Sequence, residues 1–269
     1  MDRFPPDPVA RAGSVGGRWS GRLVLGRGLV AFVGPGAAAS AHRHDAIQFA
    51  WCREREIQVT TDAGLIAANA VLIASRQLHD FDAGGAPVVV VLLEPAGPLG
   101  REIGALARDW EGRDLLGRLD GIDFPSATDP SALVGSARQL LRALAGEASL
   151  VRGRVPRPEV LDAQRVIDSA LSGIPRLEVA ARSVGLSSRQ LRRSFVEEVG
   201  VPFRRYVLWR RLRRALLGVR DGMDLTSAAA EAGFADAAHF SRTFKQSFGL
   251  SPSEVLPFIE VAEDDFPGP

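Results

Sequence analysis

Three closely spaced arginines, Arg189, Arg192 and Arg193, carry the most specific chemistry in this chain. A guanidinium fork can pair with O6 and N7 of guanine, and it also binds phosphate oxygens. On a helix these side chains lie on the exposed side, while Leu191 and Phe195 form part of an apolar stripe. An ordinary solvated face of a core helix has the same pattern, and one such segment alone does not exclude that interpretation.

A second segment with the same layout follows later in the chain. Its apolar stripe consists of Phe240, Phe244 and Phe248, and its polar side chains include His239, Arg242 and Lys245. Residues 151–250 contain 18 Arg and Lys against 10 Asp and Glu, although the whole chain has a net charge of +1. A basic segment joined to an acidic remainder indicates that only the basic segment binds a polyanion.

Both segments need the same elements to present these side chains. Each has a short Ala-rich helix, a glycine followed by an apolar residue, a capping residue and a second helix. Gly185 and Gly233 permit the positive φ of a tight turn, and Ser187 and Asp236 can cap the helices that follow. This is the pattern of a helix-turn-helix, and its repetition in a basic segment predicts binding to double-stranded DNA.

Residues from Glu159 to Leu256 resemble the AraC/XylS family of transcription regulators. The most specific stretch runs from Ala229 to Phe234 and then from Phe240 to Pro252. The resemblance implies that each second helix enters a major groove, with the two units about one DNA turn (~34 Å) apart. Carried over by position, the DNA-binding residues are Arg189, Gln190, Arg192, Arg193, Ala238, His239, Arg242 and Lys245. Ala238 departs from the polar residue often found there, so the second unit is expected to read fewer bases.

The first part of the chain differs in pattern. Short, β-branched apolar runs between Arg22 and Glu94 predict strands of a sandwich or barrel. The family commonly carries a cupin-like β-barrel in front, which these runs fit. We therefore predict an α+β protein in four parts. They are a cupin-like sensor barrel (1–95), a helical dimerisation segment (96–150), an all-α DNA-binding domain with two helix-turn-helix motifs (155–258) and an acidic tail (259–269), with a linker over residues 146–158.

Three of the four histidines fall in the cupin pattern. His42, His44 and Gln48 resemble the first cupin motif, with Gln48 in place of the usual Glu, and His79 falls near the histidine of the second motif. A His-x-His on a strand points both rings to one face, as a pair of metal ligands requires. Glutamine is a weak ligand compared with a carboxylate, so we expect no metal cofactor. The expected role of these four residues is to bind a small effector, and His42, His44 and His79 are the ligands in the alternative with a metal.

An amphipathic stretch from Leu133 to Leu144 has an apolar stripe suited to a partner helix. The stripe consists of Leu133, Ala137, Leu140 and Leu144. It predicts a homodimer, and the alternative is that the stripe packs on the chain's own barrel.

The leading hypothesis is a ligand-responsive transcription regulator rather than an enzyme. The resemblance favours activation through contact with RNA polymerase, although repression uses the same domain. Two alternatives stay open, a cupin metalloenzyme with a DNA-binding tail and a barrel that binds no ligand and only pairs subunits. The chain has no apolar run of membrane-spanning length, its start lacks the apolar core of a secretory signal, and Cys52 is its only cysteine. We therefore expect a cytoplasmic protein without a membrane partner.

Overall fold

The computed structural model describes residues 17–26, 28–95, 98–108, 115–119, 121–123, 130–145 and 156–263. Strands dominate its first part and helices its second, which confirms the predicted α+β class. The strands are β1 (Gly21–Leu25), β2 (Leu29–Pro35), β3 (Ala39–His42), β4 (Ile47–Trp51), β5 (Ile57–Thr61), β6 (Gly64–Ala68), β7 (Ala70–Ile73), β8 (His79–Phe81), β9 (Pro87–Leu93) and β10 (Ile259–Glu263). The helices are α1 (Pro98–Arg108), α2 (Pro130–Ala145), α3 (Pro158–Ser169), α4 (Leu177–Ser183), α5 (Ser188–Ser194), α6 (Phe203–Arg220), α7 (Leu225–Glu231), α8 (Ala237–Phe248) and α9 (Pro252–Val255). The chain's first residues and most of the expected linker lie outside the described residues.

The strands form two sheets, not the closed barrel that the sequence predicted, over the ranges that the structure describes. One sheet has the order β10-β1-β2-β9-β4-β7 and the other β3-β8-β5-β6. Both contribute to one hydrophobic core, in which Trp19 contacts Phe32 of the first sheet and Phe81 of the second. Antiparallel pairing links the strands throughout, except that β10 runs parallel to β1.

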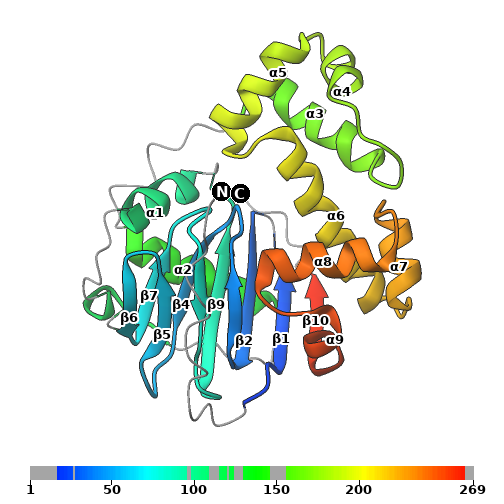
Figure 1. Ribbon diagram of the computed structural model, residues 1–269. Coiled ribbons are helices and arrows are strands. Elements are labelled where there is room, and N and C mark those ends of the chain that lie inside the picture. Colours follow the sequence, from blue (N-terminus) through cyan, green and yellow to red (C-terminus); the bar gives the residue numbers. More distant parts are fainter. Residues whose placement is uncertain are drawn as a thin grey trace, which may run out of the picture.

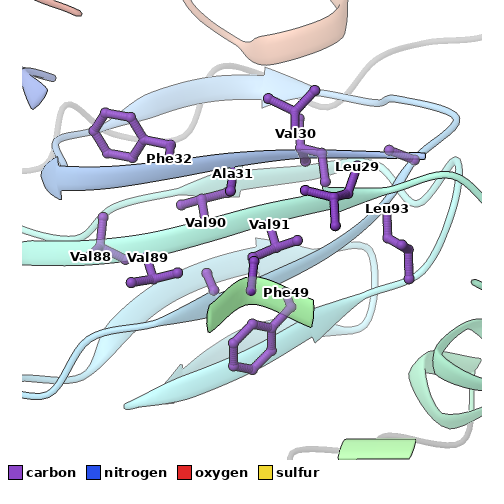
Figure 2. Close-up of a cluster of buried hydrophobic side chains, with 14 of the residues drawn as sticks. Leu29, Val30, Ala31, Phe32, Phe49, Val88, Val89, Val90, Val91 and Leu93 are labelled. Atoms are coloured by element: carbon purple, nitrogen blue, oxygen red, sulfur yellow. The ribbon is translucent and has the colours of Figure 1, made fainter. Parts of the chain in front are cut away.

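The central strands of the larger sheet are buried on both faces. Alternate side chains of a strand point to opposite faces, so strands covered on both sides are apolar at every position. Figure 2 shows Val30 and Phe32 of β2 on one side of the sheet and Ala31 on the other. Helix α2 packs against β1 and β2, and α1 packs against β4 and β7. The run Val88–Leu93 in β9 is accordingly buried along its whole length.

The apolar stripe of α2 is turned toward this core. Leu133, Ala137, Leu140 and Leu144 are each 0% exposed within the single chain. The prediction that this stripe pairs two subunits is therefore wrong, and the alternative, packing on the chain's own sheet, is what the structure has. The physical reason is that an amphipathic stripe can be buried equally well by a sheet face or by a partner helix. The sequence pattern alone therefore does not tell which of the two covers it.

Introducing a charge into this stripe should unfold the N-terminal part instead of separating subunits. We expect Leu140→Glu to lower the free energy of unfolding by more than about 3 kcal/mol, because the buried leucine contacts are lost and a carboxylate enters the core. Urea unfolding followed by circular dichroism measures the effect. Gln139→Glu, at the neighbouring exposed position, is the matched control and should change little. A variant that stays as stable as the native chain would contradict the buried placement of α2.

The last described strand is a second departure from the sequence prediction. An acidic tail was expected after residue 258, but Ile259–Glu263 forms β10 at the edge of the larger sheet. Residues 264–269 lie outside the described residues.

The helices contribute to two hydrophobic cores. Helix α8 and much of α6 and α7 share a core with the sheets, whereas α3, α4, α5 and the start of α6 form a separate one. Figure 1 shows α3–α5 standing apart at the top, joined to the rest by α6. Among the described helices, none is long and apolar enough to cross a membrane.

Candidate DNA-binding surface and effector cavity

The first helix-turn-helix consists of α4, a turn at Gly185 and α5. Gly185 has a φ of +69°, as the predicted tight turn requires. Ser187 caps α5: its Oγ accepts a hydrogen bond from the Gln190 backbone N–H at 3.2 Å. The Gln190 side-chain oxygen in turn accepts from the Ser187 N–H at 2.9 Å. This capping box uses the amide oxygen of Gln190 and leaves its amide nitrogen outside the cap.

Helix α5 separates apolar from basic side chains. Leu191 and, just beyond the helix, Phe195 are fully buried. Arg189, Arg192 and Arg193 are all exposed, as the sequence predicts for a surface that reads DNA. The Arg193 guanidinium donates to the Glu197 carboxylate at 2.6 Å, one helical turn away. Arg193 therefore has a local ion pair, and Arg189 and Arg192 are the better candidates for base contacts.

The second helix-turn-helix consists of α7, a turn at Gly233 and α8. Gly233 has a φ of +85°, and a Cβ there would lie 2.0 Å from the Leu171 carbonyl oxygen. Asp236 accepts a hydrogen bond from the His239 backbone N–H, which confirms the predicted cap. Ala238, Arg242 and Lys245 are exposed, and the half-buried His239 packs edge-on against Phe234. Phe240 and Phe244 are buried beneath them.

The C-terminal end of α8 is hydrogen-bonded to β3 and the residue that follows it. The Gly249 carbonyl oxygen accepts bonds from the Ser40 N–H at 3.1 Å and the Ser40 Oγ at 2.6 Å. The Arg43 N–H also donates to the Gln246 carbonyl oxygen at 3.4 Å. Gly249 has a φ of +72°, and a Cβ there would lie 2.3 Å from the Ser40 carbonyl oxygen. The second unit thus approaches β3 as closely as only a glycine permits.

Helix α6 and β10 fasten the same unit to the larger sheet. The Arg213 guanidinium donates to the carbonyl oxygens of Gly26 at 2.7 Å and Leu25 at 2.9 Å. It also donates to the Glu263 carboxylate at 2.9 Å. At the other end of β10, Arg22 pairs with Glu260 at 2.6 Å. These bonds place the second helix-turn-helix unit in direct contact with the larger sheet.

An apolar cavity of about 120 Å³ lies where the sheets meet the second unit. Leu25, Phe32 and Leu92 line it from the larger sheet, and Leu216, Phe244 and Phe248 line it from α6 and α8. His42, His44 and Gln48 supply polar groups in its wall. His79, predicted to belong to the same site, does not line the cavity but contacts the histidines that do. A mostly apolar cavity with a few convergent polar groups is a typical small-molecule site.

The three N-terminal histidines form one buried cluster. His42 lies at the end of β3 and is paired with His79 of β8 across the smaller sheet. His44 lies beyond the strand, which differs from the predicted His-x-His strand, yet its ring centroid is 5.6 Å from that of His42. The exposed fractions are 6% for His42, 5% for His44 and 1% for His79.

Burial keeps these imidazoles neutral. Loss of hydration, together with the smaller effect of neighbouring histidines, lowers the pKa of His42 to about 4 and that of His79 to about 3. Burial also lowers the pKa of His44, against the opposing effect of its hydrogen bond with Gln48. All three rings are therefore neutral imidazoles at neutral pH, each with one nitrogen that is not protonated.

Several residues of this site were not predicted from the sequence. Ser40, Arg213 and Gly249, and the strand that provides Glu263, act through contacts between segments far apart in the chain. The alternation of apolar and polar residues at the start of Ile259–Glu263 indicates a strand. Five residues are too few, however, to indicate which strand it pairs with.

Comparison with known proteins identifies the C-terminal part. A family model described as "Helix-turn-helix domain" matches residues 180–256. The chain is 28% identical over 158 residues to the HTH-type transcriptional activator RhaR of Pectobacterium carotovorum, covering 54% of this chain and 56% of that protein. It is 38% identical over 79 residues to the HTH-type transcriptional activator RhaS of Escherichia fergusonii, covering 29% and 28%. The chain thus matches only about half the length of RhaR.

Solved structures support the two-part fold. Wild-type ToxT from Vibrio cholerae, solved with a bound unsaturated fatty acid, has a TM-score of 0.50 at 14% identity, covering 92% of this chain and 100% of that one. At this identity the likeness concerns the fold alone. The repeated helix-turn-helix units and the sequence relatives bear out the expected resemblance: the C-terminal part of the chain is an AraC-type helix-turn-helix domain, similar to those of transcriptional activators such as RhaR and RhaS.

Proposed function

We propose that this protein is a sequence-specific DNA-binding transcription regulator that responds to a small effector. The observation that carries the proposal is the paired exposure of Arg189 and Arg192 on α5 and Arg242 on α8. The 18-residue helix α6 joins the two units, and at 1.5 Å per residue it spans about 27 Å. That length is comparable to one turn of DNA, so both second helices can reach successive major grooves.

The test of DNA recognition is selection of duplexes from a random pool by the full chain. We expect enrichment of a site with two half-sites about one helical turn apart. The selected duplex should bind far more tightly than a scrambled one at the same salt concentration. Equal affinity for the two duplexes would contradict sequence-specific regulation.

We propose that the effector occupies the cavity between the sheets and the second unit. Its walls favour an apolar molecule with one hydrogen-bonding group, directed to His42, His44 or Gln48. Because α6 and α8 form part of the wall, an effector there would contact the sensor and the DNA-binding unit together. Differential contact of this kind is what couples a ligand to a second site.

A simple probe of this cavity is 4-ethylphenol, an apolar ring with a single hydroxyl. We expect it to raise the melting temperature of the full chain, because a ligand that binds only the folded state stabilises it. Replacing both His42 and His44 with alanine should remove this response, whereas affinity for the selected DNA should remain. His239→Ala, at the histidine outside the cavity, is the control. A response that persists in the double variant would move the effector site elsewhere.

We further propose activation through contact with RNA polymerase in the cytoplasm, in keeping with the names of RhaR and RhaS. A homodimer also belongs to this proposal, but its interface must lie outside the buried α2 stripe. Sedimentation of the full chain on the selected duplex measures whether two copies bind together.

A further inference from the structure

The histidine cluster has an arrangement that the effector proposal does not use. Each imidazole is hydrogen-bonded through Nδ1 to a backbone carbonyl oxygen. The distances are 2.8 Å from His42 to Ser40, 2.9 Å from His44 to Ala46 and 2.9 Å from His79 to Gln77. A carbonyl oxygen only accepts, so Nδ1 carries the proton in His42 and His79. The remaining nitrogen of these two neutral rings, Nε2, is then an acceptor, whereas the Nε2 of His44 is in contact with Gln48.

The three histidine rings lie close together in the interior of the protein. The three rings each present a possible ligand atom within 4.8 Å of the others. The Nε2 of His79 is buried and has no hydrogen-bond partner among the described residues. The Nε2 of His44 lies 2.9 Å from the side-chain oxygen of Gln48. A buried acceptor without a matching donor, such as the Nε2 of His79, is unfavourable by itself and favours an electrophile beside it.

We propose that His42, His44 and His79 bind one divalent transition-metal ion through Nε2, with the Gln48 side chain as a neighbouring oxygen donor. The Nδ1 bonds to backbone carbonyls are the support that metal-bound histidines require, because they fix the tautomer and the ring orientation. The inference concerns residues shared with the proposed effector site but does not depend on DNA binding.

The donor set selects the class of metal. Three imidazole nitrogens suit Zn²⁺, Ni²⁺, Co²⁺ or Cu²⁺ and not Mg²⁺ or Ca²⁺, which prefer oxygen ligands. A tetrahedral ion about 2.1 Å from each nitrogen needs nitrogen separations of roughly 3.4 Å. The possible ligand atoms of the three rings lie within 4.8 Å of one another, so the rings must move slightly closer together to bind the ion. Because His42, His44 and Gln48 also line the cavity, the open coordination position would face it.

The experiment titrates the chelator-treated full chain with Co²⁺ and follows the visible absorption of the bound ion. We expect one Co²⁺ per chain, displaced by Zn²⁺, and a higher melting temperature with Zn²⁺. His79→Ala should weaken metal binding by more than about 100-fold, because one of three ligands is lost. It should leave the wall of the cavity, and hence the response to 4-ethylphenol, in place.

Two further variants keep the test decisive. His239→Ala changes the one histidine outside the cluster and should bind Co²⁺ as the native chain does. Gln48→Glu supplies an anionic donor and should tighten binding by at least about tenfold, even if His79→Ala fails to fold. Absence of both a Co²⁺ spectrum and a Zn²⁺-induced rise in melting temperature would overturn the metal proposal. Binding of the metal-free chain to its selected duplex is measured separately, so failure of either proposal leaves the other open to its own result.

Discussion

Replacing Arg192 and Arg242 together by alanine should nearly abolish the preference of the protein for its selected duplex. Each arginine that pairs with a guanine contributes about 1–3 kcal/mol of discrimination. The two side chains lie on different units with separate cores, so their effects should add. The combined loss is then about 2–6 kcal/mol, which corresponds to at least about a 30-fold weaker complex. Fluorescence anisotropy at a fixed salt concentration measures it.

Two controls separate base reading from general charge. Arg165→Ala removes an exposed arginine of α3, outside both second helices, and should leave the preference intact. Lys245→Ala should weaken binding to all duplexes similarly and reduce the salt slope by about one, as expected of a phosphate contact. Unchanged affinity of the Arg192, Arg242 double variant for the selected duplex would show that the two second helices do not read DNA.

Gly249→Ala should detach the second helix-turn-helix unit from β3. A left-handed backbone costs a non-glycine residue about 1–3 kcal/mol. The new Cβ would also lie 2.3 Å from the Ser40 carbonyl oxygen and 2.7 Å from His42 Nδ1. Backbone cannot move aside as a flexible side chain does, so the bonds between Ser40 and Gly249 should break. Hydrogen exchange of the Ser40 amide measures this directly, and we expect a lower melting temperature.

Gly185→Ala is the matched control for this prediction. Gly185 has a φ of +69°, close to the +72° of Gly249, but no atom lies within 4 Å of a Cβ built there. It therefore carries the conformational cost without the collision. The difference in unfolding free energy between the two variants isolates the contact between α8 and β3. Equal stability losses, with the Ser40 amide still protected in Gly249→Ala, would contradict the docking of α8.

The sequence predicted what depends on local geometry. Caps at Ser187 and Asp236 and turns at Gly185 and Gly233 each involve residues a few positions apart, so the two helix-turn-helix units could be located closely. Clustering of His42, His44 and His79 was also expected, from motif resemblance. For the apolar face of α2 the sequence allowed two alternatives, a partner subunit or the chain's own sheet. A stripe of leucines indicates that the face is covered but not by what.

The contacts between the two sheets and the second helix-turn-helix unit could not be predicted from local sequence patterns. Arg213 of α6 bonds to Leu25 and Gly26, which precede it by 188 and 187 positions. From the sequence alone, an arginine on a basic helix is expected to bind DNA. That Arg213 is instead buried against a sheet becomes visible only in the three-dimensional structure. The same holds for the phenylalanines of α8, which fit either a core of the unit itself or the wall of a cavity shared with the sheets.

The parallel pairing of β1 with β10 bears on how the protein is made. Arg22 and Glu260, which join these strands, are 238 positions apart, so the ribosome synthesises β10 after every other described element. Until then the outer edge of β1 exposes unpaired backbone groups, and such edges are prone to pair with other chains. Contacts of this range also slow folding. During biosynthesis both helix-turn-helix units are therefore made before the larger sheet can be completed. The stage at which this sheet still lacks β10 is then the most sensitive to aggregation.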